Sequence, residues 1–312
     1  MPEFLSELFK LAPGALELGL INALVVLALF LSYTMLNVCD LSTDGCFTLG
    51  AAVGAMVALS GHPFLSIIAA MVSGMLSGLV VSFLQTKMGI NSLLAGIIVN
   101  TGLYSINILI MKNSSLVNLN KTETVFTLLK EKLKGTFLEG SYKIIIALIF
   151  VVLVIIFLSF FLRTRLGLAI RATGNNPAMV KASSINPAFT TIVGLCVANA
   201  FTALSGCLLA QNQKSANIDI GNGMVTVALA SLLIGNVFLG KGKVTRRAIG
   251  AVLGAVVFRF VYAIALRFNM PASMLKLVSA VIVILAIFVP YAASKSSQVK
   301  RRMELKGGKE NA

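Results

Sequence analysis

The sequence predicts an all-α fold, a polytopic membrane helical bundle with about nine spans (between eight and ten). Two observations carry this prediction. Hydrophobic residues make up 57% of the chain and charged residues only 12%, which is about half the charged share of a soluble domain. Apolar stretches of about 20 residues recur along the whole length, and a helix of that length crosses a bilayer. We therefore expect residues 1–312 to form a single transmembrane domain.

The expected spans follow from the apolar segments, of which the second and seventh are short and rich in glycine. They are roughly residues 15–36, 43–60, 64–86, 91–111, 143–162, 188–211, 223–239, 247–267 and 274–292. Pairs of glycines four residues apart predict close helix–helix contacts. These pairs are Gly50 and Gly54, Gly74 and Gly78, and Gly250 and Gly254.

The basic residues predict the orientation of the bundle, because Lys and Arg gather in cytoplasmic connections. Residues 163–187 and 241–247 are basic and contain no acid, and residues 293–312 form a basic tail. If all three lie in the cytoplasm, nine spans place the N-terminus and the 112–142 loop outside. The five lysines of that loop run against the rule and are partly balanced by three glutamates.

Two segments outside the spans have amphipathic character. Residues 1–14 are too short and too charged to cross a membrane, so we expect an interfacial N-terminal helix. The stretch TVFTLLKEKL in the 112–142 loop predicts a short surface helix.

An internal repeat accompanies the nine spans. FTLGAAVGAMVAL matches VTVALASLLIG, and KMGINSLLAGIIV matches FNMPASMLKLVSAVIV, each about 180 residues later. Five crossings separate the equivalent elements, so the two copies have opposite orientations, which is the inverted-repeat pattern of many transporters. Chance similarity between apolar sequences is the alternative.

The stretch RATGNNPAMVKASSIN, residues 171–186, is polar and basic and lies between two spans. Asn176 suits an N-cap, and Pro177 suits the first position of a helix. The pattern predicts a short cytoplasmic helix with Met179, Val180 and Ile185 available for contact, whereas a plain connecting loop is the alternative.

Other classes of protein find little support. The net charge of +15 follows the connections between spans and forms no nucleic-acid-binding domain. His62 is the only histidine, and the four cysteines have no metal-ligand spacing. GNVFLGKG resembles a phosphate-binding loop but lacks the Ser or Thr that holds magnesium. We expect no enzyme, no cofactor and no metal site.

GLAIRATGNNPAMVKASSIN and DLSTDGCFTLGAAVGA resemble two landmarks of one family, the permease subunits of ATP-binding-cassette importers of the branched-chain amino acid and ribose type. The resemblance covers residues 15–292, and Ser184 stands where the family usually has glycine. It implies a type II importer-like bundle in a bacterial inner or plasma membrane. The implied partners are a separate ATPase subunit that hydrolyses ATP, an extracellular substrate-binding lipoprotein, a second permease subunit in a homodimer, and membrane lipid.

The resemblance also implies that a coupling helix at about 175–185 docks in a groove of the ATPase. Pro177 and the turn at Gly174 are expected to matter more than any single charge. The ATPase-coupling residues would be Arg171, Gly174, Asn175, Asn176, Pro177, Met179, Val180, Lys181 and Ile185.

Polar residues within spans are candidates for the substrate path, because they favour a wet cavity or a helix interface. Hydrogen bonding between helices is the alternative for each. Arg259 is expected to pair with a carbonyl or with Asp40 or Asp44, or else to attract an anionic substrate group. The candidates are Asn100, Thr101, Ser105, Asn199, Thr202, Asn236 and Arg259.

The stretches LLAGIIVNTGLYSI and AQNQKSANIDIGNGMVTVALASLLIG are similar to a subgroup found with binding proteins assigned to tryptophan or tyrosine. An aromatic or branched-chain amino acid is thus the expected solute, with a sugar, a nucleoside or riboflavin as alternatives. A self-contained secondary transporter is the rival function. It would need acids within the spans, and we expect the acids near spans, Glu17, Asp40, Asp44 and Asp219, to lie at the edges.

Overall fold

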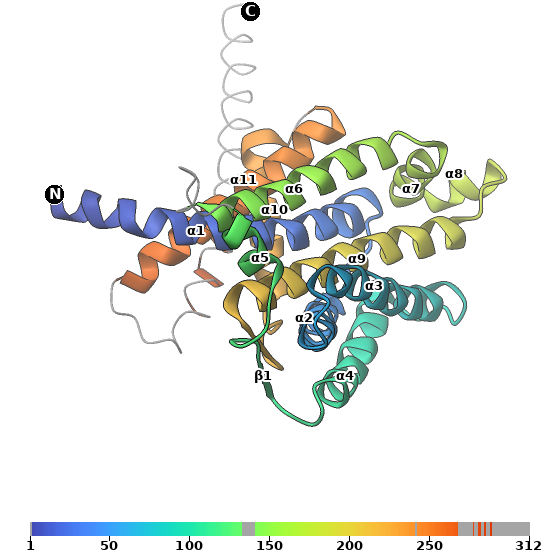
Figure 1. Ribbon diagram of the computed structural model, residues 1–312. Helices are drawn as coiled ribbons and strands as arrows, with labels where there is room; N and C mark the ends of the chain where they lie inside the picture. Colours follow the sequence, from blue (N-terminus) through green and yellow to red (C-terminus); the bar gives the residue numbers. More distant parts are fainter. Residues whose placement is uncertain are drawn as a thin grey trace, which may run out of the picture.

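A computed structural model describes residues 2–132, 141–240, 242–267 and the single positions 277, 280, 281, 284 and 288. In this part of the chain the fold is a bundle of helices (Figure 1). Six of these helices are long and apolar enough to cross a membrane, and two shorter apolar helices accompany them. Eight of the nine expected spans are therefore helices, whereas the ninth, 274–292, lies outside the continuously described residues.

The helices and strands follow the apolar segments closely. In chain order they are α1 Pro2–Leu29, the π-helix η1 Phe30–Met35, α2 Thr43–Leu59, α3 Pro63–Thr86, α4 Ser92–Ile110, β1 Leu116–Asn118, α5 Val125–Lys132, α6 Tyr142–Phe161, α7 Arg165–Asn175, α8 Pro177–Ala182, α9 Pro187–Gln213, β2 Ser215–Asn217, α10 Met224–Leu239 and α11 Val244–Arg267.

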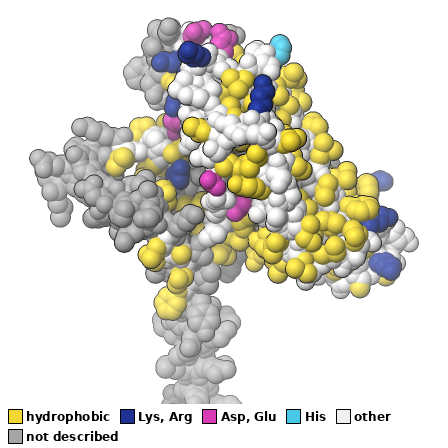
Figure 2. Space-filling view, turned by 90° about the horizontal axis from the view of Figure 1, so that it is seen from below, with side chains coloured by type: hydrophobic (Ala, Val, Ile, Leu, Met, Phe, Trp, Pro, Cys, Tyr) yellow, Lys and Arg dark blue, Asp and Glu magenta, His cyan; other side chains and the backbone are white. Residues whose placement is uncertain are grey.

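Two central helices organise the bundle. The membrane-length parts of α1 and α9 are each 78% buried, and they pack against each other. α3 and α2 pack along α9, whereas α11 and α10 pack together beside α1. α4 and α6 lie at the periphery, where only 28% of the residues in the most apolar stretch of each helix are buried. Hydrophobic side chains accordingly cover much of the visible surface in Figure 2, as expected where lipid is the solvent.

The glycine pairs form the predicted close contacts. A Cβ at Gly50 would collide with the backbone of Ala203 in α9, and one at Gly54 would meet Cys207 one turn later. Gly74 of α3 faces the carbonyl of Asn199, again in α9. Small residues thus let α2 and α3 approach α9 at backbone distance.

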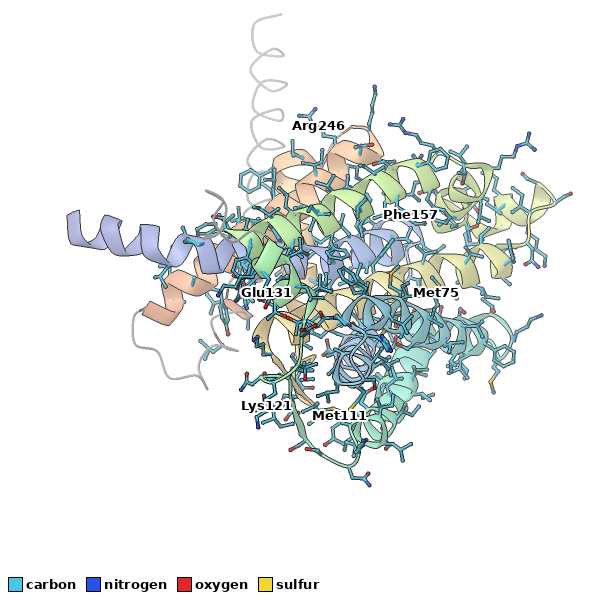
Figure 3. The ribbon with its side chains drawn as sticks, viewed as in Figure 1. Met75, Met111, Lys121, Glu131, Phe157 and Arg246 are labelled. Atoms are coloured by element: carbon cyan, nitrogen blue, oxygen red, sulfur yellow. The ribbon has the colours of Figure 1, made fainter. Side chains whose placement is uncertain are left out.

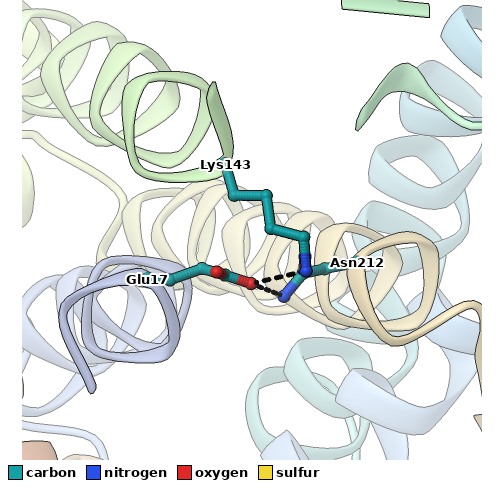
Figure 4. A network of polar contacts seen from close by, with 3 residues as sticks. All are labelled: Glu17, Lys143 and Asn212. Carbon is teal, nitrogen blue, oxygen red and sulfur yellow. Dashed lines mark hydrogen bonds and ion pairs between the residues drawn. The ribbon is translucent and has the colours of Figure 1, made fainter. Parts of the chain in front are cut away.

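Two ends of the bundle can be distinguished. At the strand end, β1 pairs with β2 in an antiparallel arrangement, with Val117 opposite Ala216. The same end holds a polar network in which Glu17 of α1 accepts from Lys143 of α6 at 3.3 Å and from Asn212 of α9 (Figure 4). At the opposite end, the α8 end, the last turn of η1 contacts α7.

The two short helices α2 and α10 start near the same point and run in opposite directions. The carboxylate of Asp44, in the first turn of α2, accepts from Gly223 N at 3.0 Å and from Val225 N at 2.8 Å. α2 then runs beside α9 towards the strand end. α10 runs to the α8 end, where Arg163 Nη2 reaches Thr245 Oγ1 at 3.5 Å.

Two expectations about the segments outside the spans need correction. Residues 2–14, expected as a separate interfacial helix, continue into the first span within α1. The cytoplasmic coupling loop expected over residues 163–187 holds two helices rather than one, since Arg165–Asn175 form α7, which Thr164 caps by accepting from Gly167 N at 3.2 Å. The expected surface helix in TVFTLLKEKL is confirmed as α5, whose Val125 and Phe126 are buried.

Candidate functional site

The short helix α8 begins as the sequence predicts. Asn176 has an extended backbone, and its Oδ1 accepts from Met179 N at 3.1 Å. Pro177 occupies the first helical position, where a missing N–H costs nothing. The cap and the proline fix the start of α8 through local chemistry alone, so this prediction is confirmed.

The faces of α8 differ from the prediction. The helix ends at Ala182, because Ser184 adopts a left-handed φ of 61° that favours glycine. Val180 is buried against the bundle and is not available for contact, whereas Met179 is 56% exposed. Ile185 is also exposed. Among the charged and polar members of the predicted set, Lys181 and Asn175 are exposed and Arg171 is half-buried.

Gly174 does not form the predicted turn. It lies inside α7, where a Cβ would collide with the carbonyl of Met35 at the end of η1. Its role is therefore a close contact between α7 and the end of the first span. A cavity of about 410 Å³ lies beside it and is lined by Asn37, Thr86 and Pro177, among others. α7 and α8 are thus connected to the ends of several spans.

A second cavity, of about 310 Å³, lies on the side of the bundle between α2, α4 and the start of α10. It brings together three of the predicted path residues, Asn100, Thr101 and Ser105, all on α4. Thr101 and Ser105 are exposed although α4 is a membrane-length apolar helix. Asp44, Thr48, Tyr104, Asn107 and Asn222 complete its polar lining.

Tyr104 and Asn107 are not among the path residues predicted from the sequence. A signal for them exists, because Asn100, Tyr104 and Asn107 are spaced four and three residues apart and so share one face of α4. Asn107 is buried, and its Nδ2 donates to the carbonyl of Gly45 at 3.1 Å, which fixes α4 against α2.

Asn199 and Thr202 of α9 do not line this cavity. Asn199 is buried and donates to Asp40 Oδ2 at 2.9 Å, while Thr202 donates to the carbonyl of Ala198 at 3.3 Å. Asp40 itself is 2% exposed and accepts from Ser42 N at 2.8 Å and Ser42 Oγ at 2.6 Å. The expectation that Asp40 lies at an edge is wrong, because the segment before α2 folds back into the bundle.

The remaining candidates also lie elsewhere. The Arg259 guanidinium lies 5.0 Å from the ring centre of Tyr262. The expected pair with Asp40 or Asp44 is wrong, since these carboxylates bind Asn199 and the start of α10. Asn236 is half-buried near the end of α10 and is not part of the cavity on α4.

The six apolar helices of membrane length among the described residues define a multi-pass membrane protein. Comparison with known proteins agrees. The model of the family described as "Branched-chain amino acid transport system / permease component" matches residues 14–287. The chain belongs to this family, and it is a multi-pass protein of the bacterial inner membrane with a role in transport.

Curated relatives include transport permeases of different solutes. The chain is 32% identical to the tyrosine transport system permease protein of Clostridioides difficile (strain R20291), over 85% of this chain and 86% of that protein. It is 34% identical to an uncharacterised protein of Rickettsia prowazekii (strain Madrid E), over 71% and 75%. It is 24% identical to the ribose import permease protein of Escherichia coli (strain K12), over 80% and 76%. No solved structure matches the chain.

Proposed function

We propose that this chain is the permease subunit of an ATP-binding-cassette importer. It forms the path for a small solute that an external binding protein delivers, and a separate ATPase supplies the energy. The single observation that carries the proposal is α8, a capped helix at the end of the bundle that exposes an apolar side chain.

The geometry of α8 suits a mechanical contact. Its inner side is anchored by Val180, and α7 is held against the first span through Gly174. Its outer side presents Met179 and Lys181. A force on this surface therefore acts on α7, η1 and α9 together, because packed helices move as rigid bodies rather than deform. This is the behaviour expected of a coupling helix.

The cavity on α4 supports the position of the path. Asn100, Thr101 and Ser105 form a polar side on α4, a helix of membrane length. Exposing such polar groups to the hydrocarbon of the bilayer is energetically costly. A second copy of the chain that faces this side would enclose a polar channel between the two subunits. We therefore place the path at a homodimer interface, with α8 in the cytoplasm and the strand end outside.

The packing also supports an inverted repeat. α9 contacts α3 where the carbonyl of Asn199 meets Gly74, and α1 contacts α11 where Gly19 meets Val256. The two contacts are equivalent under the repeat, because Asn199 follows Gly19 by about 180 positions and Val256 follows Gly74 by about the same offset. The opposite directions of α2 and α10 fit the same relation.

For the solute, we propose an aromatic amino acid. The permease relative from C. difficile is named for tyrosine transport. The cavity offers hydroxyl and amide groups, the carboxylate of Asp44 and the ring of Tyr104. These groups can bind the polar and aromatic parts of such a solute as it passes. A branched-chain amino acid, a sugar, a nucleoside and riboflavin are the alternatives to compare in uptake assays.

The docking role of α8 is tested by Met179→Asp. We expect this variant to reach the membrane in normal amount and to lose co-purification with the ATPase subunit of its transport system, because a carboxylate would have to be buried in the contact. Met88→Asp is the matched control, since Met88 is also an exposed methionine and lies in the turn after α3. It should keep the association.

Retention of the ATPase by Met179→Asp at the level of Met88→Asp would remove α8 from the contact. Ion-driven uptake by the purified chain alone in liposomes, without ATP, would instead favour a secondary transporter.

A further inference from the structure

Basic side chains from three segments converge at the α8 end, beside the start of α11. Arg163, which follows α6, reaches Thr245 with its Nη2 at 3.5 Å. Arg171 of α7 and Arg247 of α11 both lie beside η1, because α7 packs against η1 and the Arg247 guanidinium faces Phe30, the first residue of η1. Lys243 and Arg246 are exposed beside them, and Figure 3 shows Arg246 at the outer edge of the bundle. We call these five residues the arginine cluster.

Arg247 lies in an environment that a bound anion would stabilise. Its guanidinium carbon lies 5.8 Å from the ring centre of Phe30, which is fully buried. Its Nε is shielded from solvent and has no hydrogen-bond partner among the described residues. A shielded guanidinium N–H without a partner is costly, and a second arginine nearby raises that cost.

The local backbone adds to the positive potential. The first turn of α11 contains Arg246 and Arg247, and the positive end of a helix dipole disfavours cations at this position. Neither residues 163–187 nor residues 242–267 contain an Asp or Glu. The elements that build the cluster therefore supply no carboxylate of their own to offset it.

The surroundings of the arginine cluster indicate the kind of anion that it would bind. The cluster lies where α6 ends and α11 begins, which is the edge of the apolar zone. Phe160, Ile249 and Leu253 on the same two helices expose large hydrophobic side chains. A ligand at this place meets cations at one end and an apolar helix surface below them. A phospholipid with an anionic head group matches both the cations and the apolar surface, whereas free phosphate matches only the cations.

We propose that the arginine cluster binds the phosphate of an anionic phospholipid, whose acyl chains lie along α6 and α11. Arg171 and Arg247 hold the head group, because guanidinium groups donate paired hydrogen bonds to phosphate oxygens. The bound lipid would neutralise the start of α11 and link it to α7. This site is independent of the docking role proposed for α8.

The test uses the full-length chain purified in uncharged detergent. Native mass spectrometry would measure retention of dioleoyl phosphatidylglycerol, with dioleoyl phosphatidylcholine and inorganic phosphate as comparison probes. The double variant Arg171→Gln and Arg247→Gln should retain phosphatidylglycerol roughly tenfold less than the unchanged chain. Lys87→Gln removes an exposed cation at the same end of the bundle and should have no effect.

Each other outcome overturns the proposal. Equal retention of phosphatidylcholine would show a binding site without charge selection, and inorganic phosphate that displaces the lipid at equal concentration would show an anion site without a lipid. Loss of the ATPase with unchanged lipid retention would assign the cluster to a protein contact. If the double glutamine variant does not fold, Arg171→Gln alone and the double lysine variant, which keeps both charges, give the comparison.

Discussion

α4 and α9 are both apolar helices with polar residues in their middle, yet the bundle uses these residues in opposite ways. On α9 the polar groups point into the protein, where Asn199 bonds Asp40 and Ser205 donates to the carbonyl of Ile21 at 2.7 Å. On α4, Thr101 and Ser105 stay open at a cavity. The polar residues of α9 therefore hold the bundle together, whereas those of α4 remain available for the proposed solute path.

The largest effect is expected where α9 meets α2. A Cβ at Gly206 would collide with the carbonyl of Phe47, so Gly206→Val should force the helices apart and abolish the folded, monodisperse protein. Gly102→Val on α4 is the control, because a Cβ at Gly102 meets nothing within 4 Å. Size-exclusion chromatography in detergent compares them. Equal behaviour of the two variants would mean that α9 is not the central packing element.

A smaller effect is expected from replacing Asn199, which is bonded to Asp40. Asn199→Leu removes the donor to Asp40 Oδ2 and leaves this oxygen buried without that bond. We expect a loss of about 2 kcal/mol in the free energy of unfolding, since the acceptor is a carboxylate. The midpoint of thermal unfolding in detergent measures this change.

Asn100→Leu makes the same chemical change on α4 and is the matched control. Asn100 lines the cavity, so this variant should unfold at nearly the temperature of the unchanged chain while solute uptake falls. Destabilisation as large as that of Asn199→Leu would show that Asn100 and Asn199 have the same structural role and would contradict the distinction between α4 and α9.

The sequence predicts the parts of this structure that depend on local chemistry. The expected span 91–111 is α4, Ser92–Ile110, because its ends are set by Asn91, whose Oδ1 accepts from Leu93 N at 2.9 Å, and by the loss of apolar residues. Asn176 and Pro177 define the start of α8 for the same reason. The glycine pairs were also predictable, because their spacing alone creates a flat helix face.

The remaining features depend on contacts that sequence spacing does not reveal. Asp40 is buried only because α9 brings Asn199 to it from 159 positions away in the sequence. The close contact of Gly174 with Met35 likewise joins α7 to the first span, so the residue type suggested a turn where the fold needed a small side chain. The open polar side of α4 and the buried polar groups of α9 also belong to this second group, because only the packing of neighbouring helices distinguishes them.

The most direct test of the proposed path compares two cysteine variants in the assembled transporter. Ser105→Cys on α4 should react with a membrane-impermeant maleimide above the level of the unsubstituted chain, because its side chain faces the polar cavity. Thr202→Cys on α9 should not react, since this position is 1% exposed within the core. Reaction of Thr202→Cys at the rate of Ser105→Cys, or an unreactive Ser105→Cys under all transport conditions, would contradict a solute path along α4.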